Sequence, residues 1–478
     1  MLSAESICQF ILESEPGRAE ALELLAEICF IQDRFEEALV NYERAFALRR
    51  NDADIAYNLG TVQMELKRYS EALSSYDRAI EIEPRHAAAL INRGNVLQML
   101  GRYIEAVRNH DEALLSEPDN AEAYFNRANA LLALERHDEA LASYERALAI
   151  NARHGDALIN RGNALSALNR HDEALASYEQ AIAISPNRVD AHYDRGNALR
   201  TLARDAEAIA SYDKAITIQP SHTDAHWNRA WALLALGDFE RGWEEYEWRW
   251  RTEYAKHEYR AFGKPLWTGT ADSADKTVLI HTEQGLGDTL QFIRYVPLAA
   301  QRCGRVILEV QRPLLRICER FSQWAQLVPF GEPIASHDFQ CPMLSLPLAF
   351  RTTPKTIPAD VPYIFANPEL VEKWRERLLA PPRAMKVGLV WAGNPRQKSE
   401  PRRAVGLKHC TPLFAVPDVR WFSLQVGERA ANVQELAPGK ITDLSAHLTD
   451  FAETAAAIAN LDLVVTTDTA VAHLAGAM

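Results

Sequence analysis

Apolar, small and aromatic residues recur along the first half of the chain at a fixed interval of 34 residues. A ring occupies seven positions in this register: Tyr42, Tyr76, His110, Tyr144, Tyr178, Tyr212 and Tyr246. A small residue stands four positions before each ring, from Ala38 to Gly242, and an alanine stands three positions after each of the first six. Because spacings of three and four residues place side chains on one helix face, small residues there let two helices approach closely. The pattern predicts an all-α array of about seven repeats over residues 1–252.

A proline lies in the turn that follows several of these segments (Pro84, Pro118, Pro186 and Pro220). A helix-turn-helix unit of this length with these features resembles the tetratricopeptide repeat, which stacks into a superhelix. Such an array is not catalytic by itself. Its function must therefore lie in what it binds, or in the part of the chain that follows it.

One polar position recurs on the first helix of each repeat. It is occupied by Asn58, Asn92, Asn126, Asn160, Asp194 and Asn228, and an arginine follows most of these residues directly. Stacked repeats align equivalent positions, so we expect a ladder of amides beside a row of arginines. An asparagine can hydrogen-bond the backbone of an extended peptide, and the arrangement resembles the asparagine ladder of protein O-GlcNAc transferases, which implies peptide binding. Alternatively, these side chains only bond neighbouring turns and stabilise the stack.

Composition limits the possible classes of function. The 478-residue chain carries a formal charge of −13, which argues against a nucleic acid or an anionic membrane as the main partner. Its six cysteines form no Cys-x-x-Cys pair, which disfavours a structural zinc site and a disulfide framework. No apolar stretch reaches the roughly 18 residues of a membrane span, and the N-terminus has no signal-like pattern. We expect a cytoplasmic protein.

The seventh repeat departs from the others because tryptophans and charges replace its alanines. Large aromatic residues at the end of a repeat array usually pack against a neighbouring domain, so we expect this of Trp243, Trp248 and Trp250. Residues 253–275, which contain Gly263, Pro265 and a polar run, indicate a linker.

Beyond the linker the helical period is lost and short apolar runs begin. They cover residues 278–280, 306–310, 387–391, 421–424 and 461–465. Nearly continuous apolar strands separated by helical stretches predict parallel sheets covered on both faces. We interpret residues 276–366 and 367–478 as two Rossmann-like halves with a cleft between them. Ligands bind such sheets beyond the carboxyl ends of the strands, so we expect the ligand-binding residues in the loops that follow the strands.

Three of these loops contain residues suited to anion binding or proton transfer. Gly285, Gly287 and Asp288 follow the first strand, where the glycines permit a tight turn and Asp288 is also suited to capping a helix. Asn394 follows a later strand and leads into five cations: Arg396, Lys398, Arg402, Arg403 and Lys408. That loop either grips a diphosphate or is a solvated charge run. Asp468 and Thr469 begin a helix whose N–H groups would accept phosphate.

Taken together, the Leu-Gly-Asp loop, the Gly-Leu-Val-Trp-Ala-Gly-Asn strand end and the Asp-Thr-Ala-x-x-His-Leu motif resemble the heptosyltransferase-like glycosyltransferases of family 9, which have the GT-B fold. The resemblance spans residues 276–478. It implies an inverting glycosyltransferase with a nucleotide-diphosphate sugar as co-substrate, without a metal or another cofactor. The implied donor-binding residues are Gly285, Gly287, Asn394, Arg402, Arg403, Asp468, Thr469, Ala470 and His473, and the implied general base is Asp288. Without the resemblance, His473 would be interpreted as a helix-face histidine bonded to backbone.

Two departures from that family affect the prediction. Ala470 replaces a glycine that lets phosphate approach the backbone. A GT-B second half also continues through a further strand and helix, so we expect the second half here to be incomplete. The leading hypothesis is a glycosyltransferase whose repeat array recruits a protein acceptor. The alternative is a non-catalytic adaptor that binds proteins through its repeats and carries a degenerate transferase domain.

Overall fold

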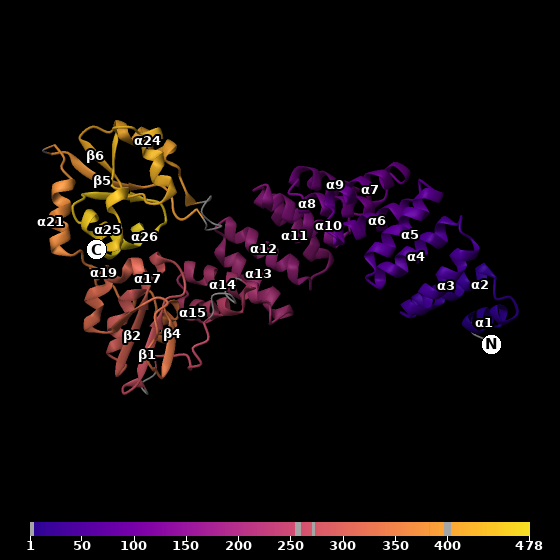
Figure 1. The fold of residues 1–478 in the computed structure, drawn as a ribbon, viewed down its shortest axis with the longest axis horizontal. Coiled ribbons are helices and arrows are strands. Elements are labelled where there is room, and N and C mark those ends of the chain that lie inside the picture. The colour runs from indigo at the N-terminus through magenta and orange to yellow at the C-terminus, as the bar shows by residue number, and fades with distance from the viewer. Residues whose placement is uncertain (1–3, 254–259, 270–272, 382, 396–402) are drawn as a thin grey trace. The chain divides into compact units, whose positions relative to one another are not determined.

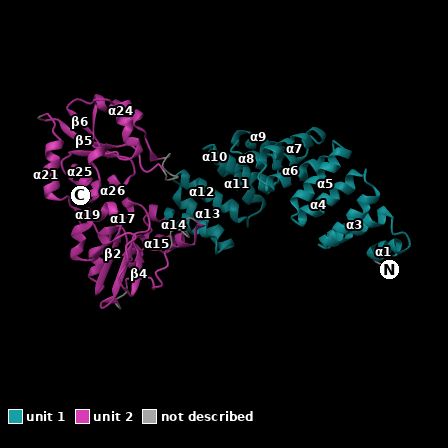
Figure 2. Ribbon diagram, in the orientation of Figure 1, with its two compact units in different colours: residues 1–232 teal, residues 233–478 magenta. Residues whose placement is uncertain are grey.

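The computed structural model describes residues 4–253, 260–269, 273–381, 383–395 and 403–478. The chain divides into two compact units, Met1–Ala232 and Leu233–Met478 (Figure 2). The first unit is entirely helical, and the second contains the last repeat helix and two parallel sheets.

Helices of 13 and 14 residues alternate from α2 to α14, and from α1 to α13 each packs against the next (Figure 1). The repeat helices are α1 (Ala4–Ser14), α2 (Ala19–Ile31), α3 (Phe35–Leu48), α4 (Ala53–Glu65), α5 (Tyr69–Ile82), α6 (Ala87–Met99), α7 (Tyr103–Ser116), α8 (Ala121–Ala133), α9 (His137–Ile150), α10 (Gly155–Ala167), α11 (His171–Ile184), α12 (Val189–Thr201), α13 (Asp205–Ile218), α14 (Thr223–Ala235) and α15 (Phe239–Tyr246). This alternation confirms the predicted helical repeats.

In four repeats the ring packs against a glycine on the first helix of the same repeat, namely Gly60, Gly94, Gly162 and Gly196. A Cβ atom added at Gly162 would lie 2.4 Å from the Cε1 atom of Tyr178, and one at Gly94 would lie 2.5 Å from Cε1 of His110. No real Cβ atom makes contacts this short, so these sites exclude any side chain unless the ring moves. The close helix approach expected from the sequence is confirmed.

The arginine row ties each repeat to its neighbours. Arg161 donates to the Ser177 hydroxyl of its own repeat, whereas the other four arginines bond an acid on the preceding repeat, as in the Nε–Oδ1 distance of 2.6 Å between Arg127 and Asp111. The same guanidinium donates to the Ser143 hydroxyl on the second helix of its own repeat, at 2.6 Å. Equivalent pairs to an acid join Arg93 to Asp77, Arg195 to Glu179 and Arg229 to Asp213. The arginines of this row therefore stabilise the stack.

The second unit contains two four-stranded parallel sheets with the same order of strands. One sheet has the order β3-β2-β1-β4 and the other β7-β6-β5-β8. The strands are β1 (Thr277–His281), β2 (Arg305–Val310), β3 (Gln326–Pro329), β4 (Phe339–Pro342), β5 (Met385–Val390), β6 (Val419–Ser423), β7 (Ile441–Asp443) and β8 (Leu463–Thr466). Five of them lie on the predicted apolar runs, whereas β3, β4 and β7 were not predicted. The chain order reverses between β1 and β4 and between β5 and β8, which makes these pairs the topological switch points.

Short helices connect the strands and pack around both sheets (Figure 1). They are α17 (Leu286–Phe292), α18 (Val296–Ala300), α19 (Leu315–Cys318), α20 (Leu346–Ala349), α21 (Pro368–Arg377), α23 (Leu407–Cys410), α24 (Asn432–Leu436), α25 (Phe451–Ile458) and α26 (Ala470–Ala477). This architecture agrees with two Rossmann-like halves, and a GT-B fold stays a prediction. In the described part of the chain, no helix is long and apolar enough to cross a membrane.

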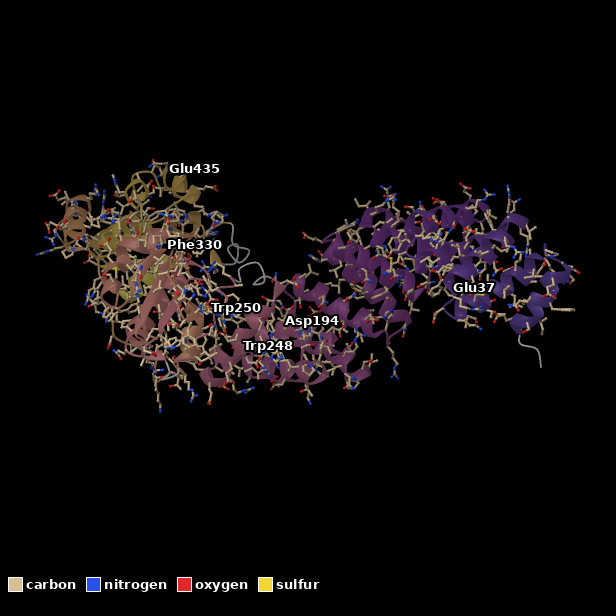
Figure 3. The ribbon with its side chains drawn as sticks, turned by 60° about the horizontal axis from the view of Figure 1, so that its bottom comes forward. Glu37, Asp194, Trp248, Trp250, Phe330 and Glu435 are labelled. Carbon is tan, nitrogen blue, oxygen red and sulfur yellow. The ribbon has the colours of Figure 1, made fainter. Side chains whose placement is uncertain are left out.

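Part of the segment interpreted as a linker belongs to the first sheet. Leu266 pairs in parallel with Gln340 of β4, and the Trp267 N–H donates to the Gln340 carbonyl at 2.8 Å. The Trp267 side chain is almost completely buried. Trp243 on α15 packs edge to face with Phe292 of α17 at a centroid distance of 6.1 Å, which confirms its predicted contact with the α/β region. Trp248 and Trp250 lie on the short 3₁₀ helix Glu247–Arg251, where they stack on neighbouring arginines (Figure 3).

Replacing Gly162 by valine is expected to destabilise the repeat array by about 1–3 kcal/mol, because the new side chain overlaps the Tyr178 ring. The matched control is Gly155→Val, since a Cβ atom at Gly155 meets nothing within 4 Å. Thermal unfolding followed by circular dichroism should show a lower midpoint for Gly162→Val alone. Equal midpoints for the two variants would contradict the proposed packing.

Candidate functional site

The ladder amides are partly engaged in bonds between repeats. The Asn160 amide donates to Oδ1 of Asn129 in the preceding repeat at 2.9 Å, and the Asn228 amide donates to Asn197 at 2.8 Å. Each receiving amide also accepts a hydrogen bond from a buried tyrosine, as in the 2.7 Å contact from the Tyr144 hydroxyl to Asn129. These contacts support the stacking role. Because an asparagine amide has two donors and an acceptor, they also leave peptide binding possible.

Asp194 is the one carboxylate in the ladder (Figure 3). Its side chain lies on α12, half-buried among the repeats. Burial raises the pKa of Asp194 to about 6, the nearby charge of Asp190 acts in the same direction, and a hydrogen bond with Asn163 lowers it. An ionised carboxylate here is therefore less stable than the neutral amide found in the other repeats.

The loop after β1 places Asp288 at the third position of α17. Its Oδ2 atom accepts a hydrogen bond of 2.9 Å from the backbone N–H of Gly285, the N-cap residue. The capping role considered for Asp288 is thus present, exerted from within the first turn. Burial raises the pKa of the Asp288 carboxyl, whereas the Gly285 hydrogen bond and the nearby His473 lower it.

The loop after β8 brings a carboxylate, an arginine and a histidine together at the start of α26. Arg403 donates to Oδ2 of Asp468 at 3.1 Å, and His473 Nε2 lies 3.8 Å from Oδ1 of the same carboxylate. The hydroxyls of Thr466 and Thr469 are 3.0 Å apart. Asp468 is exposed, whereas the side chains of Arg403 and His473 are each about 30% exposed (30% and 31%). These contacts therefore place the Arg403 guanidinium and the His473 ring beside the Asp468 carboxylate.

These two loops meet across the two halves. A Cβ atom at Gly287 would lie 2.7 Å from Cδ2 of His473 and 3.3 Å from Cα of Ala470. Gly287 therefore permits the approach of α26 to α17, a role in packing between the halves that the sequence did not indicate. The charges of His473 and Asp468 both act on Asp288, which places the three side chains in one electrostatic environment. A salt bridge of 2.7 Å between Arg316 and Asp450 joins the halves elsewhere.

The remaining predicted site residues belong to the loop that follows β5. Asn394 follows β5 and is exposed. Arg402, together with Arg396 and Lys398, lies outside the described residues. Of the five cations predicted to bind an anion in this loop, the structure describes Arg403 and Lys408. Lys408 is exposed on α23.

Two glutamines that the sequence did not single out position the loops. Gln311, directly after β2, accepts from the Thr289 hydroxyl at 2.9 Å and donates to the Gln284 carbonyl at 3.1 Å. Gln425, shortly after β6, accepts from the backbone N–H of Ala392 at 3.1 Å. Each glutamine follows the strand beside the central strand of its half and holds the loop of that central strand. The sequence feature that could have identified both residues is a glutamine one or two positions after a predicted strand.

A buried ionic network also reaches the first loop. Arg249 of the 3₁₀ helix donates to both carboxylate oxygens of Glu283, at 3.0 and 3.1 Å, and both side chains are at most 3% exposed. Glu283 also accepts from the backbone N–H of Leu344 at 2.8 Å. Arg249 further bonds Glu247 and the Ser345 hydroxyl. The network fixes the loop that carries Asp288 against the end of the last repeat helix and the segment after β4.

No group of three or more histidine, cysteine, aspartate or glutamate side chains in the described ranges is arranged to hold a metal ion.

Replacing Asp194 by asparagine is expected to stabilise the array by about 1–3 kcal/mol at pH 7.5. The folded-state pKa, about 6, lies above the ordinary value of 3.8, so the folded state binds the proton more tightly. The stability that this proton gives is present below about pH 4 and is lost as the pH rises through about 6. Unfolding midpoints of both proteins should therefore converge at low pH and separate above pH 6. The exposed substitution Asp138→Asn serves as control, and a pH-independent difference would contradict the assignment.

Comparison with known families identifies the repeats. A tetratricopeptide repeat model matches residues 17–85, 51–114 and 85–153. Further models described as TPR repeat or tetratricopeptide repeat match residues 162–202, 189–222 and 224–242.

Individual relatives share parts of the chain. Protein FlbA of Caulobacter vibrioides is 26% identical over 272 residues, which cover 52% of this chain and 45% of FlbA. This chain thus spans less than half the length of that relative. The TPR protein YrrB, whose structure is described as having an unusual peptide-binding site, is 28% identical and aligns over 38% of this chain and 95% of its own, with a TM-score of 0.35. A tetratricopeptide repeat protein from Parabacteroides merdae is 20% identical over 50% of this chain and 94% of its own, with a TM-score of 0.41. The family matches show that residues 17–242 of this chain are built from tetratricopeptide repeats.

Proposed function

We propose that this chain is a glycosyltransferase that moves a sugar from a nucleotide-diphosphate donor to an acceptor hydroxyl, with the repeat array recruiting a protein acceptor. The observation that carries the proposal is the meeting of the Asp288 loop with the Asp468–His473 segment. Both lie beyond the carboxyl ends of strands at the switch points of two parallel sheets, where open α/β sheets bind ligands.

The donor diphosphate would lie at the start of α26. The first N–H groups of a helix have no partner within the helix, and the helix dipole favours an anion there. Arg403 supplies positive charge beside this helix start, the His473 ring can donate a hydrogen bond there, and Asp468 contacts both side chains. Charge-assisted contacts of this kind stabilise the diphosphate as negative charge develops on it during its departure.

Asp288 would act as general base. It takes the proton from the acceptor hydroxyl while the oxygen forms a bond to the anomeric carbon, and the diphosphate leaves with the electrons of the broken bond. One displacement inverts the configuration at that carbon. A half-buried carboxyl with a raised pKa is a stronger base than an exposed one, and the Gly285 hydrogen bond orients it.

The repeats suggest protein–protein interaction, and the proposal assigns them the recruitment of the acceptor. The alternative function is a non-catalytic adaptor that binds proteins through the repeats. It is favoured by the use of the ladder amides and arginines in stacking, since these bonds explain both rows without a peptide.

Calorimetric titration with UDP-, GDP-, ADP- and dTDP-linked sugars tests the donor site. One donor should bind saturably, and Arg403→Ala should weaken that donor by at least about tenfold through loss of a charge-assisted contact. Lys440→Ala is the matched control, because this exposed cation precedes β7, away from the loops at the carboxyl ends of the strands, and its loss should leave affinity unchanged. Absence of binding by every donor would reject the transferase and leave the adaptor.

Replacing Asp288 by asparagine should lower transfer or donor hydrolysis by about 100-fold or more while donor affinity changes by less than about threefold, because only the base is removed. The wild-type rate should fall on acidification at a pH above the ordinary range of an aspartate, since the Asp288 pKa is raised and the base must be ionised. Retained turnover in Asp288→Asn would exclude Asp288 as the base.

The double substitution Asn126→Ala with Asn160→Ala tests the ladder. If it binds extended peptides, affinity for a peptide selected from a random display library should fall at least about tenfold with little change in thermal stability. A lower unfolding midpoint with unchanged peptide affinity would instead assign these amides to stacking, as their contacts with neighbouring side chains suggest.

A further inference from the structure

A cavity of about 740 Å³ lies in the second unit, apart from the two loops that meet at Gly287. Three segments form its walls: α15 with the residue that follows it, residues 266–268, and residues 345–353. Its volume falls within the range of sites that bind small molecules or single side chains. The sequence patterns gave no indication of it, because its walls come from segments about 20 to 110 residues apart.

Aromatic and apolar groups line much of this cavity. Phe239 and Trp243 pack edge to face on α15 with a centroid distance of 5.9 Å, and Trp267 lines the opposite segment. Pro347, Leu348 and Ala349 add aliphatic surface. An aromatic face carries negative potential, so such walls favour an apolar body that bears a positive charge.

The charges of the lining are predominantly negative. Glu240 and Glu244 are four residues apart on α15, so their carboxylates lie on one helix face, and both side chains are exposed. Glu247 also lines the cavity, but it already accepts hydrogen bonds from Arg249 and Ser345. Among the described residues of the lining, Arg351 is the single cation. Two carboxylates thus face the cavity without a described ion pair to Arg351 or to any other described cation.

Other ligand classes fit this lining less well. An anion would be repelled by the two carboxylates, and a neutral apolar ligand would leave them without a partner. A metal ion is disfavoured because the described residues offer no group of three or more suitable ligands. A quaternary ammonium has no N–H group with which to satisfy carboxylate acceptors. A primary ammonium satisfies them through charge-assisted hydrogen bonds and places its alkyl chain against the aromatic walls.

We propose that this cavity binds a primary alkylammonium group, presented either by a lysine side chain of a protein partner or by a free diamine. Glu240 and Glu244 hold the ammonium, and Trp243 and Phe239 hold the alkyl chain. The site is independent of the proposed transferase function, because none of its lining residues belongs to the loops of Asp288 or Asp468.

Calorimetry of the whole chain tests the site with two probes, 1,5-diaminopentane and Nα-acetyl-lysine methylamide, and with 1-pentanol as the uncharged comparison. At least one amine should bind, with 1-pentanol at least about tenfold weaker. The double variant Glu240→Gln/Glu244→Gln should lower amine affinity by about tenfold or more. Because both side chains are exposed, this variant is expected to fold.

The matched control is Glu428→Gln/Glu435→Gln, which removes the same net charge from exposed positions outside the cavity (Figure 3). Its affinity should equal that of the wild type. Preference for the lysine derivative identifies a protein as the source of the ammonium, and preference for the diamine identifies a free amine. The proposal is overturned if neither amine binds up to about 10 mM, or if the two double variants lose affinity equally.

Discussion

Both units depend on positions where a Cβ atom does not fit. In the repeat array, the glycine of the first helix lies against the ring of the second, and a methyl group at Gly162 would overlap Tyr178. In the second unit, a methyl group at Gly287 would overlap His473. Steric exclusion at such short distances is steep, so the small residue sets how closely two helices approach. The first contact sets the geometry of each repeat, and the second determines that the loops of Asp288 and His473 face each other.

Ion pairs and hydrogen bonds add to this steric packing in both units. In four repeats the arginine of the row joins the repeat to an acid before it, and often to a polar group within it, with arginine side chains that are 13–23% exposed. Such half-buried pairs are screened less than exposed ones, and losing one partner leaves the other charge poorly solvated. In the second unit, Arg249 and Glu283 are almost completely buried, and their bidentate contact fixes the loop before Asp288. A loop held in this way would need little reorganisation during the proposed transfer reaction.

The two halves of the second unit have the same loop-fixing hydrogen bond at equivalent positions. In each, the strand order is the same and a glutamine beyond the neighbouring strand bonds the loop after the central strand, Gln311 in one half and Gln425 in the other. The loops so held are the ones that carry Gly285–Asp288 and Asn394. This equivalence is a property of parallel sheets, because the carboxyl ends of neighbouring strands meet at one edge and a side chain from one can reach the next.

The sequence by itself determined the repeat length, the helical class of the array, five of the strands and the loops that follow them. These features follow from local periodicity and from apolar runs, and each such pattern lies within one continuous segment of the chain. The strands β3, β4 and β7 are only three or four residues long, and their burial depends on the strands beside them, so the sequence did not predict them. Only the tertiary structure decided that Gly287 meets His473, that the arginine row binds acids of the preceding repeat, and that burial raises the pKa of Asp194. Each of these depends on distances between residues far apart in the chain, which no local pattern encodes.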